Sequence, residues 1–204
     1  MRFNEFKQKL KKFPLFGGEV AVQFGGVPQV MRNQLSRWKK QGLIVMLKKG
    51  LYALSQNERE GKLSKEFISA SLYQPSYISL ETALSYHKMI PEKVVPVTAV
   101  TTRKTKSFQN DEGLFLYRQL KPTAYFGFKS ARDGSGFPYY IAEPEKALLD
   151  YLYFNLGSIQ ADDADYFRSA LRLQNRSVLN REKLFSYAKR FGIKKLLKIL
   201  GNLP

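Results

Sequence analysis

The stretch that decides the predicted fold is PQVMRNQLSRWKKQGLIVMLKKGLYAL, residues 28–54. Its first half predicts a helix over residues 28–41. Three apolar side chains fall within one narrow stripe when each residue advances by about 100°, and these are Met31, Leu35 and Trp38. A proline in the first turn and a glycine after the last turn are typical of such a helix.

The second half of the stretch predicts a β-hairpin. LIVML and LYAL are β-rich runs, and Lys48, Lys49 and Gly50 form the short turn between them. This hairpin follows the predicted helix directly after Gly42, so the two elements form one local unit.

Two shorter helices are expected earlier in the chain. Residues 17–24 alternate weakly like a strand but are short enough for one helical turn between glycines, and we favour the helix. A glycine turn at residues 25–26 follows. The first helix is expected to end near Pro14. It places four apolar side chains on one face: Phe3, Phe6, Leu10 and Phe13.

The order helix, short element, helix and hairpin is that of a winged helix-turn-helix, with residues 28–41 as the recognition helix. The polar side of this helix carries residue types that pair with base edges in the major groove, although any amphipathic surface helix also has a polar side. We expect base contacts from Gln29, Arg32, Asn33 and Ser36. We expect phosphate contacts from Arg37, Lys40, Lys48 and Lys49.

Beyond the hairpin, residues 56–65 are polar and predict a linker. The chain is therefore expected to contain a DNA-binding domain, residues 1–60, and a mixed α/β domain, residues 61–204. Together they give an α+β protein whose second domain has about four strands, a strong helix from Glu143 onward and a helical C-terminus. The four β-rich runs span residues 94–102, 113–120, 124–128 and 137–142.

The charge distribution supports this division. The formal net charge is +17, with 34 basic and 17 acidic residues. Residues 1–62 contain 13 basic and 4 acidic residues, and residues 176–204 contain 8 and 1, whereas the middle of the chain is nearly neutral. A basic module attached to a neutral domain favours a nucleic-acid partner. In the C-terminal segment, we expect the leucines and Ile199 to pack in the core rather than on a membrane.

Other function classes have little support in the sequence. There is no Cys, no Walker A loop and no metalloprotease or hydrolase motif, and the single His87 has no clustered acids nearby. Glu143, Glu145 and Asp150 could form an acidic metal site, but acids at a helix start are explained by capping and the helix dipole. We therefore expect no catalysis, no metal and no cofactor. The absence of a long apolar run predicts a soluble, cytoplasmic protein.

Three segments carry a family resemblance: QLSRWKKQGLIVMLKKGLYAL (34–54), SYISLETALSYHKMIPE (76–92) and, most specifically, YYIAEPEKALLDYLYF (139–154). They resemble the antitoxins of AbiE-type abortive-infection toxin–antitoxin systems, in the same order and at similar spacing. The chain departs from that pattern in its basic end, residues 176–204, and in the basic loop of residues 103–106.

This resemblance implies a bacterial antitoxin that binds inverted repeats in its own promoter, as a monomer or as a dimer on the DNA, and represses its operon. It also implies that the second domain opposes a nucleotidyltransferase-like toxin without a stable complex, the type IV arrangement. Two alternatives remain open. One is a stand-alone winged-helix regulator with an effector-binding C-terminal domain, and the other is an RNA-binding or nuclease-associated protein that uses both basic ends.

Overall fold

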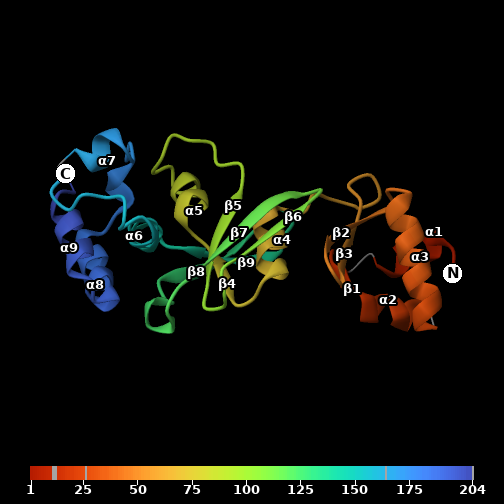
Figure 1. Cartoon of the computed structure of the whole chain (residues 1–204). Helices are drawn as coiled ribbons and strands as arrows, with labels where there is room; N and C mark the ends of the chain where they lie inside the picture. The colour runs from red at the N-terminus through yellow and green to blue at the C-terminus, as the bar shows by residue number, and fades with distance from the viewer. Residues whose placement is uncertain (11–12, 26, 164, 204) are drawn as a thin grey trace.

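The computed structural model describes residues 1–10, 13–25, 27–163 and 165–203. Over these residues the chain has a mixed α+β fold with nine α-helices and two sheets, of three and six strands. Figure 1 shows an elongated molecule with the N-terminal helices at one end, the larger sheet in the middle and the C-terminal helices at the other end.

The N-terminal part combines three helices with a small antiparallel sheet whose strand order is β1-β3-β2. The short helix expected near residues 17–24 is confirmed as α2, but the strand before it was not predicted, because two residues are too few to show a period. The elements are α1 (Phe3–Lys9), β1 (Phe16–Gly17), α2 (Gly18–Gly25), α3 (Pro28–Lys40), β2 (Ile44–Lys48) and β3 (Leu51–Leu54).

Helix α3 and the hairpin of β2 and β3 match the prediction closely. Met31, Leu35 and Trp38 are buried, and Gly42 ends the helix with a left-handed φ of 70°. Their side chains join one apolar cluster with α1, in which the rings of Phe6 and Trp38 lie 4.8 Å apart. This cluster fixes which side of α3 faces outward.

The first helix is shorter than predicted. It ends at Lys9, with Leu10 as the capping residue, so it never reaches Pro14. Phe6 and Leu10 are buried as expected, whereas Phe13 lies beyond the helix and is 45% exposed. The prediction for Phe13 was therefore wrong. Residue 26 of the expected glycine turn lies outside the described residues.

The second part is built on a six-stranded sheet of order β6-β7-β5-β4-β9-β8. Its elements are α4 (Lys65–Leu72), β4 (Ser76–Ile78), α5 (Leu80–Tyr86), β5 (Val97–Thr101), β6 (Lys106–Asn110), β7 (Gly113–Gln119), η1 (Pro122–Ala124), β8 (Phe128–Arg132), β9 (Pro138–Ala142), α6 (Pro144–Phe154), α7 (Tyr166–Ser169), η2 (Arg176–Val178), α8 (Arg181–Phe191) and α9 (Lys194–Gly201).

The expectation of about four strands is corrected to six. Strands β5, β7 and β9 fall on predicted β-rich runs, but residues 124–127 are not a strand, since Gly127 turns the chain there with a φ of 75° and β8 begins only at Phe128. Strand β6 and all of β8 beyond Phe128 lie between the predicted runs. Both lie at sheet edges and are polar and mostly exposed, which is how edge strands avoid pairing with other chains and why no apolar pattern marks them.

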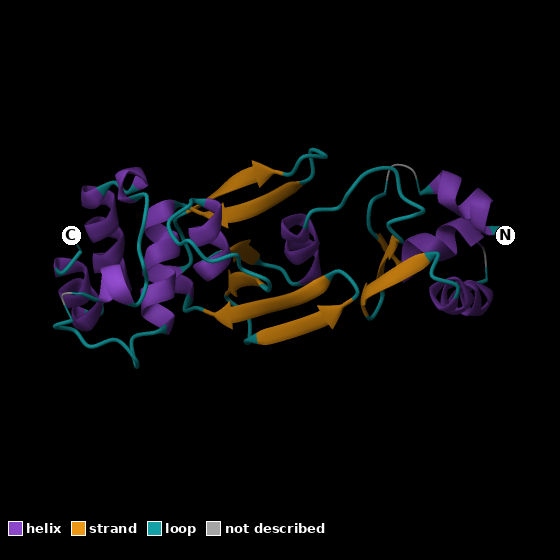
Figure 2. Ribbon diagram, turned by 90° about the horizontal axis from the view of Figure 1, so that it is seen from above, coloured by secondary structure: helices purple, strands orange, loops and turns teal. Residues whose placement is uncertain are grey.

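The helices cover the sheet unevenly. Helix α4 packs on β4, β5 and β9, while α5 packs against α6, which in turn contacts α8 and α9. Figure 2 shows the C-terminal helices gathered at the end of the molecule opposite the N-terminus. Leu196, Ile199 and Leu200 of α9 are buried, so the expected core packing of this helix is confirmed.

The hairpin touches both halves of the molecule. Ile44 and Leu54 belong to the N-terminal apolar cluster, whereas Leu47 and Ala53 belong to the cluster around the larger sheet. The Asn110 side chain donates a hydrogen bond to the Leu47 carbonyl at 2.9 Å. One side of the hairpin is therefore docked on the second part of the chain.

Candidate nucleic-acid interface

The outward face of α3 is the strongest candidate site. The buried stripe on the opposite side of the helix turns all the predicted polar residues toward solvent, and the structure brings them together on one surface. The exposed residues on this surface are Gln29, Arg32, Asn33, Ser36, Arg37 and Lys40. We call this set the α3 face, and helix α3 lies in the N-terminal part, at one end of the molecule (Figure 1).

The chemistry of the α3 face suits base recognition. Amides can donate and accept, and a guanidinium can donate, in the patterns that base edges present in the major groove. The Gln29 amide donates to the Asn33 Oδ1 at 3.2 Å, so the two amides are aligned one helical turn apart. Their remaining donors and acceptors point to solvent, where they could bind an adenine edge.

Two exposed valines lie close to this face and are not among the predicted DNA contacts. Val27, at the N-cap, is 61% exposed and Val30 is 49% exposed. Val30 lines a shallow hollow with Asn33, Gln34 and Arg37. Apolar side chains beside polar ones can contact the methyl group of thymine. The position of Val30 in the helix, off the buried stripe, was the available signal.

The charge of α3 is entirely positive. Its sequence has no acidic residue, and Arg37, Lys39 and Lys40 lie in the last turn. Cations at that end also interact favourably with the helix dipole. Among the described residues no ion pair involves Arg32, Arg37 or Lys40, so their charges stay available to phosphates.

The two lysines of the hairpin turn have different surroundings. Lys49 is exposed, whereas Lys48 is half-buried and its Nζ donates to the Leu72 carbonyl of α4 at 2.6 Å. Burial lowers the pKa of Lys48, and the nearby charges of Lys106 and Arg103 lower it further. The structure thus places Lys48 at the contact between the two parts of the chain, away from the α3 face.

The basic loop of residues 103–106 lies in the same region as Lys48. The Arg103 guanidinium sits 4.6 Å from the Tyr73 ring centroid, and the Lys106 ammonium sits 4.9 Å from that of Phe108. Aromatic rings hold both cations in place. A second group of positive charge therefore faces solvent beside the hairpin, and no local sequence pattern predicts its proximity to Lys48.

The second part of the chain contains a buried polar cluster. Lys146 and Asp150 form an ion pair on α6 and are fully buried. Tyr77 and Ser79 each donate a hydrogen bond to Asp150 Oδ2 at 2.8 Å. Burial raises the pKa of Asp150 and lowers that of Lys146, and the contact between the two groups opposes both shifts. A Lys and an Asp four residues apart in an apolar helix were the signal for this pair.

The acidic residues at the start of α6 form ion pairs and hydrogen bonds with α8 and its N-cap. Glu143 binds Lys183 at 2.9 Å and accepts a hydrogen bond from Tyr187 at 2.8 Å. Glu145 accepts from the Asn180 backbone N–H at 2.8 Å. The expectation that capping and the helix dipole explain these acids was incomplete, because no capping hydrogen bond forms and both acids bind α8 or its N-cap.

The single histidine has a hydrogen-bond partner in the fold. The Nε2 of His87 donates to the Ala142 carbonyl at 2.8 Å, and burial lowers the pKa of its ring. Within the described residues, no group of three or more His, Cys, Asp and Glu side chains could hold a metal ion. No helix in this part of the chain is long and apolar enough to cross a membrane.

Comparison of the sequence with models of protein families and with characterised proteins finds no match.

Proposed function

We propose that residues 1–60 form a winged helix-turn-helix that binds double-stranded DNA, with α3 as the recognition helix. The observation that carries this proposal is the α3 face, a continuous exposed polar and basic surface opposite a fully buried stripe. The sheet order β1-β3-β2, with a strand between the first two helices and a hairpin after the third, supports it.

In this proposal the contacts divide by chemistry. Gln29, Arg32, Asn33 and Ser36 read base edges, and Val30 contacts a thymine methyl group. Arg37, Lys40 and Lys49 bind phosphates and position the helix. Lys48, which donates to Leu72, stabilises the docked hairpin instead.

The biological role that we propose is that of an antitoxin and autorepressor. The resemblance of the three quoted segments to AbiE-type antitoxins supports it. The most specific of these segments, residues 139–154, contains the buried Lys146–Asp150 ion pair. Two copies would bind the inverted repeats of the promoter, and the second domain would neutralise a nucleotidyltransferase-like toxin without a stable complex.

The DNA proposal is tested by fluorescence anisotropy with a labelled duplex from the promoter upstream of the gene. A scrambled duplex of equal length and composition is the control. We expect tighter binding to the promoter by about a thousandfold or more at physiological salt, as for specific DNA-binding proteins. Equal affinity for the two duplexes would contradict sequence recognition.

The antitoxin proposal has its own test, which does not depend on the first. A nucleotidyltransferase-like gene beside this one is expressed in trans from an inducible promoter, with and without the full chain. We expect growth arrest to be relieved by the chain, without co-purification of the two proteins. Arrest that persists at full expression of the chain would refute this role and leave DNA binding untouched.

A further inference from the structure

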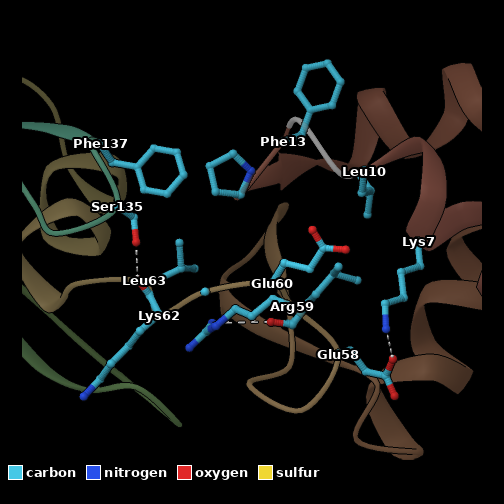
Figure 3. Close-up of a pocket in the computed structure, with 13 residues that line it drawn as sticks. Lys7, Leu10, Phe13, Glu58, Arg59, Glu60, Lys62, Leu63, Ser135 and Phe137 are labelled. Carbon is cyan, nitrogen blue, oxygen red and sulfur yellow. Dashed lines mark hydrogen bonds and ion pairs between the residues drawn. The ribbon is translucent and has the colours of Figure 1, made fainter.

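A pocket with a volume of about 400 Å³ lies where the two parts of the chain meet. Figure 3 shows its walls, which come from the N-terminal helix and hairpin on one side and from the second part on the other. A pocket of this size is within the range that holds small organic ligands. None of the proposed DNA contacts lines it.

One wall of the pocket is apolar. The buried side chains of Leu10, Leu54 and Leu63 line it, together with the rings of Phe13 and Phe137. The Phe137 ring is held in place by stacking on Phe67, with 4.6 Å between the centroids. A flat apolar molecule could pack against these side chains and bury its faces.

The other wall is polar, and its central residue is Arg59. This side chain is only 8% exposed, and its Nη1 binds Glu112 at 3.0 Å and the Leu54 carbonyl at 3.4 Å. The Arg59 Nε is buried and has no hydrogen-bond partner among the residues that the structure describes. A buried donor without an acceptor costs free energy, so an acceptor brought by a ligand would be favoured.

The other charges of the pocket limit what that acceptor can be. Glu58 also lines the pocket, but Lys7 neutralises it at 2.8 Å. Glu60 adds a second carboxylate, and Lys62 a further cation. With Glu112, the partner of Arg59, the charged groups here are three cations and three carboxylates. The unpartnered Arg59 Nε still favours an acceptor, and a doubly charged phosphate would meet stronger repulsion from the carboxylates than a singly charged group. Arginine binds planar carboxylates with two parallel hydrogen bonds.

We propose that this pocket binds a small aromatic carboxylate, with its ring against Leu63 and Phe137 and its carboxylate on Arg59. Such a ligand would contact both parts of the chain at once. The proposal stands without the DNA-binding proposal, because it depends only on the pocket and is tested without DNA.

The probe for the test is 2-naphthoate, titrated into the ¹⁵N-labelled full chain and followed by NMR. We expect saturable shifts of the Gly61 and Ser135 amides, which lie in the pocket wall, and none of the Gly157 amide, which lies elsewhere. We also expect 2-naphthalenemethanol, which keeps the rings and lacks the charge, to bind about tenfold more weakly, as loss of a charged hydrogen bond implies.

Two variants separate recognition from folding. Arg59→Met removes the guanidinium and its ion pair with Glu112, whereas Glu112→Gln removes only that ion pair. We expect Arg59→Met to weaken 2-naphthoate binding about tenfold or more and Glu112→Gln to change it little. The proposal is overturned if 2-naphthoate does not saturate in the millimolar range, if the shifts lie outside the pocket, or if both variants bind like the wild type.

Discussion

Helices α3 and α6 both carry charged side chains, but they use them in opposite ways. On α3, Arg32 and Lys40 are exposed, and no ion pair involves them among the described residues. On α6, Lys146 and Asp150 are fully buried and bind each other. Charges whose partners lie inside the molecule hold the fold together, whereas charges left open to solvent can bind something else. This contrast separates the proposed interface from the structural core.

The largest effect is expected at the buried pair of α6. Asp150→Ala leaves the Lys146 charge buried without its partner and removes the acceptor of Tyr77 and Ser79. We expect a loss of about 3–5 kcal/mol in the free energy of unfolding, measured by denaturant titration. The control Asp111→Ala, in an exposed turn, should stay within about 0.5 kcal/mol of the wild type. Equal stability of the two variants would show that α6 does not depend on this pair.

A smaller effect distinguishes the two lysines of the hairpin turn. Lys49→Ala should weaken binding to any DNA and lower the slope of log affinity against log salt by about 0.9, the value for one lost phosphate contact. Lys48→Ala should leave that slope unchanged and lower the midpoint of thermal unfolding, because it removes the bond to Leu72. If Lys48→Ala flattened the salt dependence as much as Lys49→Ala, the docked position of the hairpin would not be the DNA-bound one.

The smallest expected effect concerns the contact between α6 and α8. Burial raises the pKa of Glu143, but hydrogen bonds from Lys183 and Tyr187 outweigh it and hold that pKa below the ordinary value of 4.5. A carboxyl group with a lowered pKa stabilises the fold above its unfolded pKa, and this contribution is lost as pH falls through the folded pKa.

Thermal unfolding of the wild type and Glu143→Gln at a series of pH values tests this. We expect the wild type to be more stable at neutral pH and the difference to shrink below pH 4.5. A difference that stays constant down to acidic pH would mean that the Glu143 charge contributes nothing to the contact.

The sequence was most informative where the helical period was strong. The stripe of Met31, Leu35 and Trp38 predicted the orientation of α3, since a buried stripe of three large residues leaves one side for solvent. The hairpin was also predicted, because its turn and its two apolar runs lie close together in the chain.

The sequence was least informative where position depends on distant residues. The sequences of β6 and β8 resemble loops because both strands lie at sheet edges, where their residues are polar and mostly exposed. The hydrogen bond from Lys48 to the Leu72 carbonyl joins residues 24 apart, and no local sequence pattern predicts it. For the same reason the pocket beside Arg59, which residues from both parts of the chain line, had no sequence signal.

The central claim is that the α3 face reads DNA, and the most direct test is the ratio of promoter to scrambled-duplex affinity for Arg32→Ala/Asn33→Ala. Both side chains are exposed, so the variant should fold normally. We predict a loss of about 1–3 kcal/mol for each lost base contact, seen on the promoter and much less on the scrambled duplex, so that the ratio falls. An unchanged ratio in a folded variant would contradict the assignment of α3 as the recognition helix.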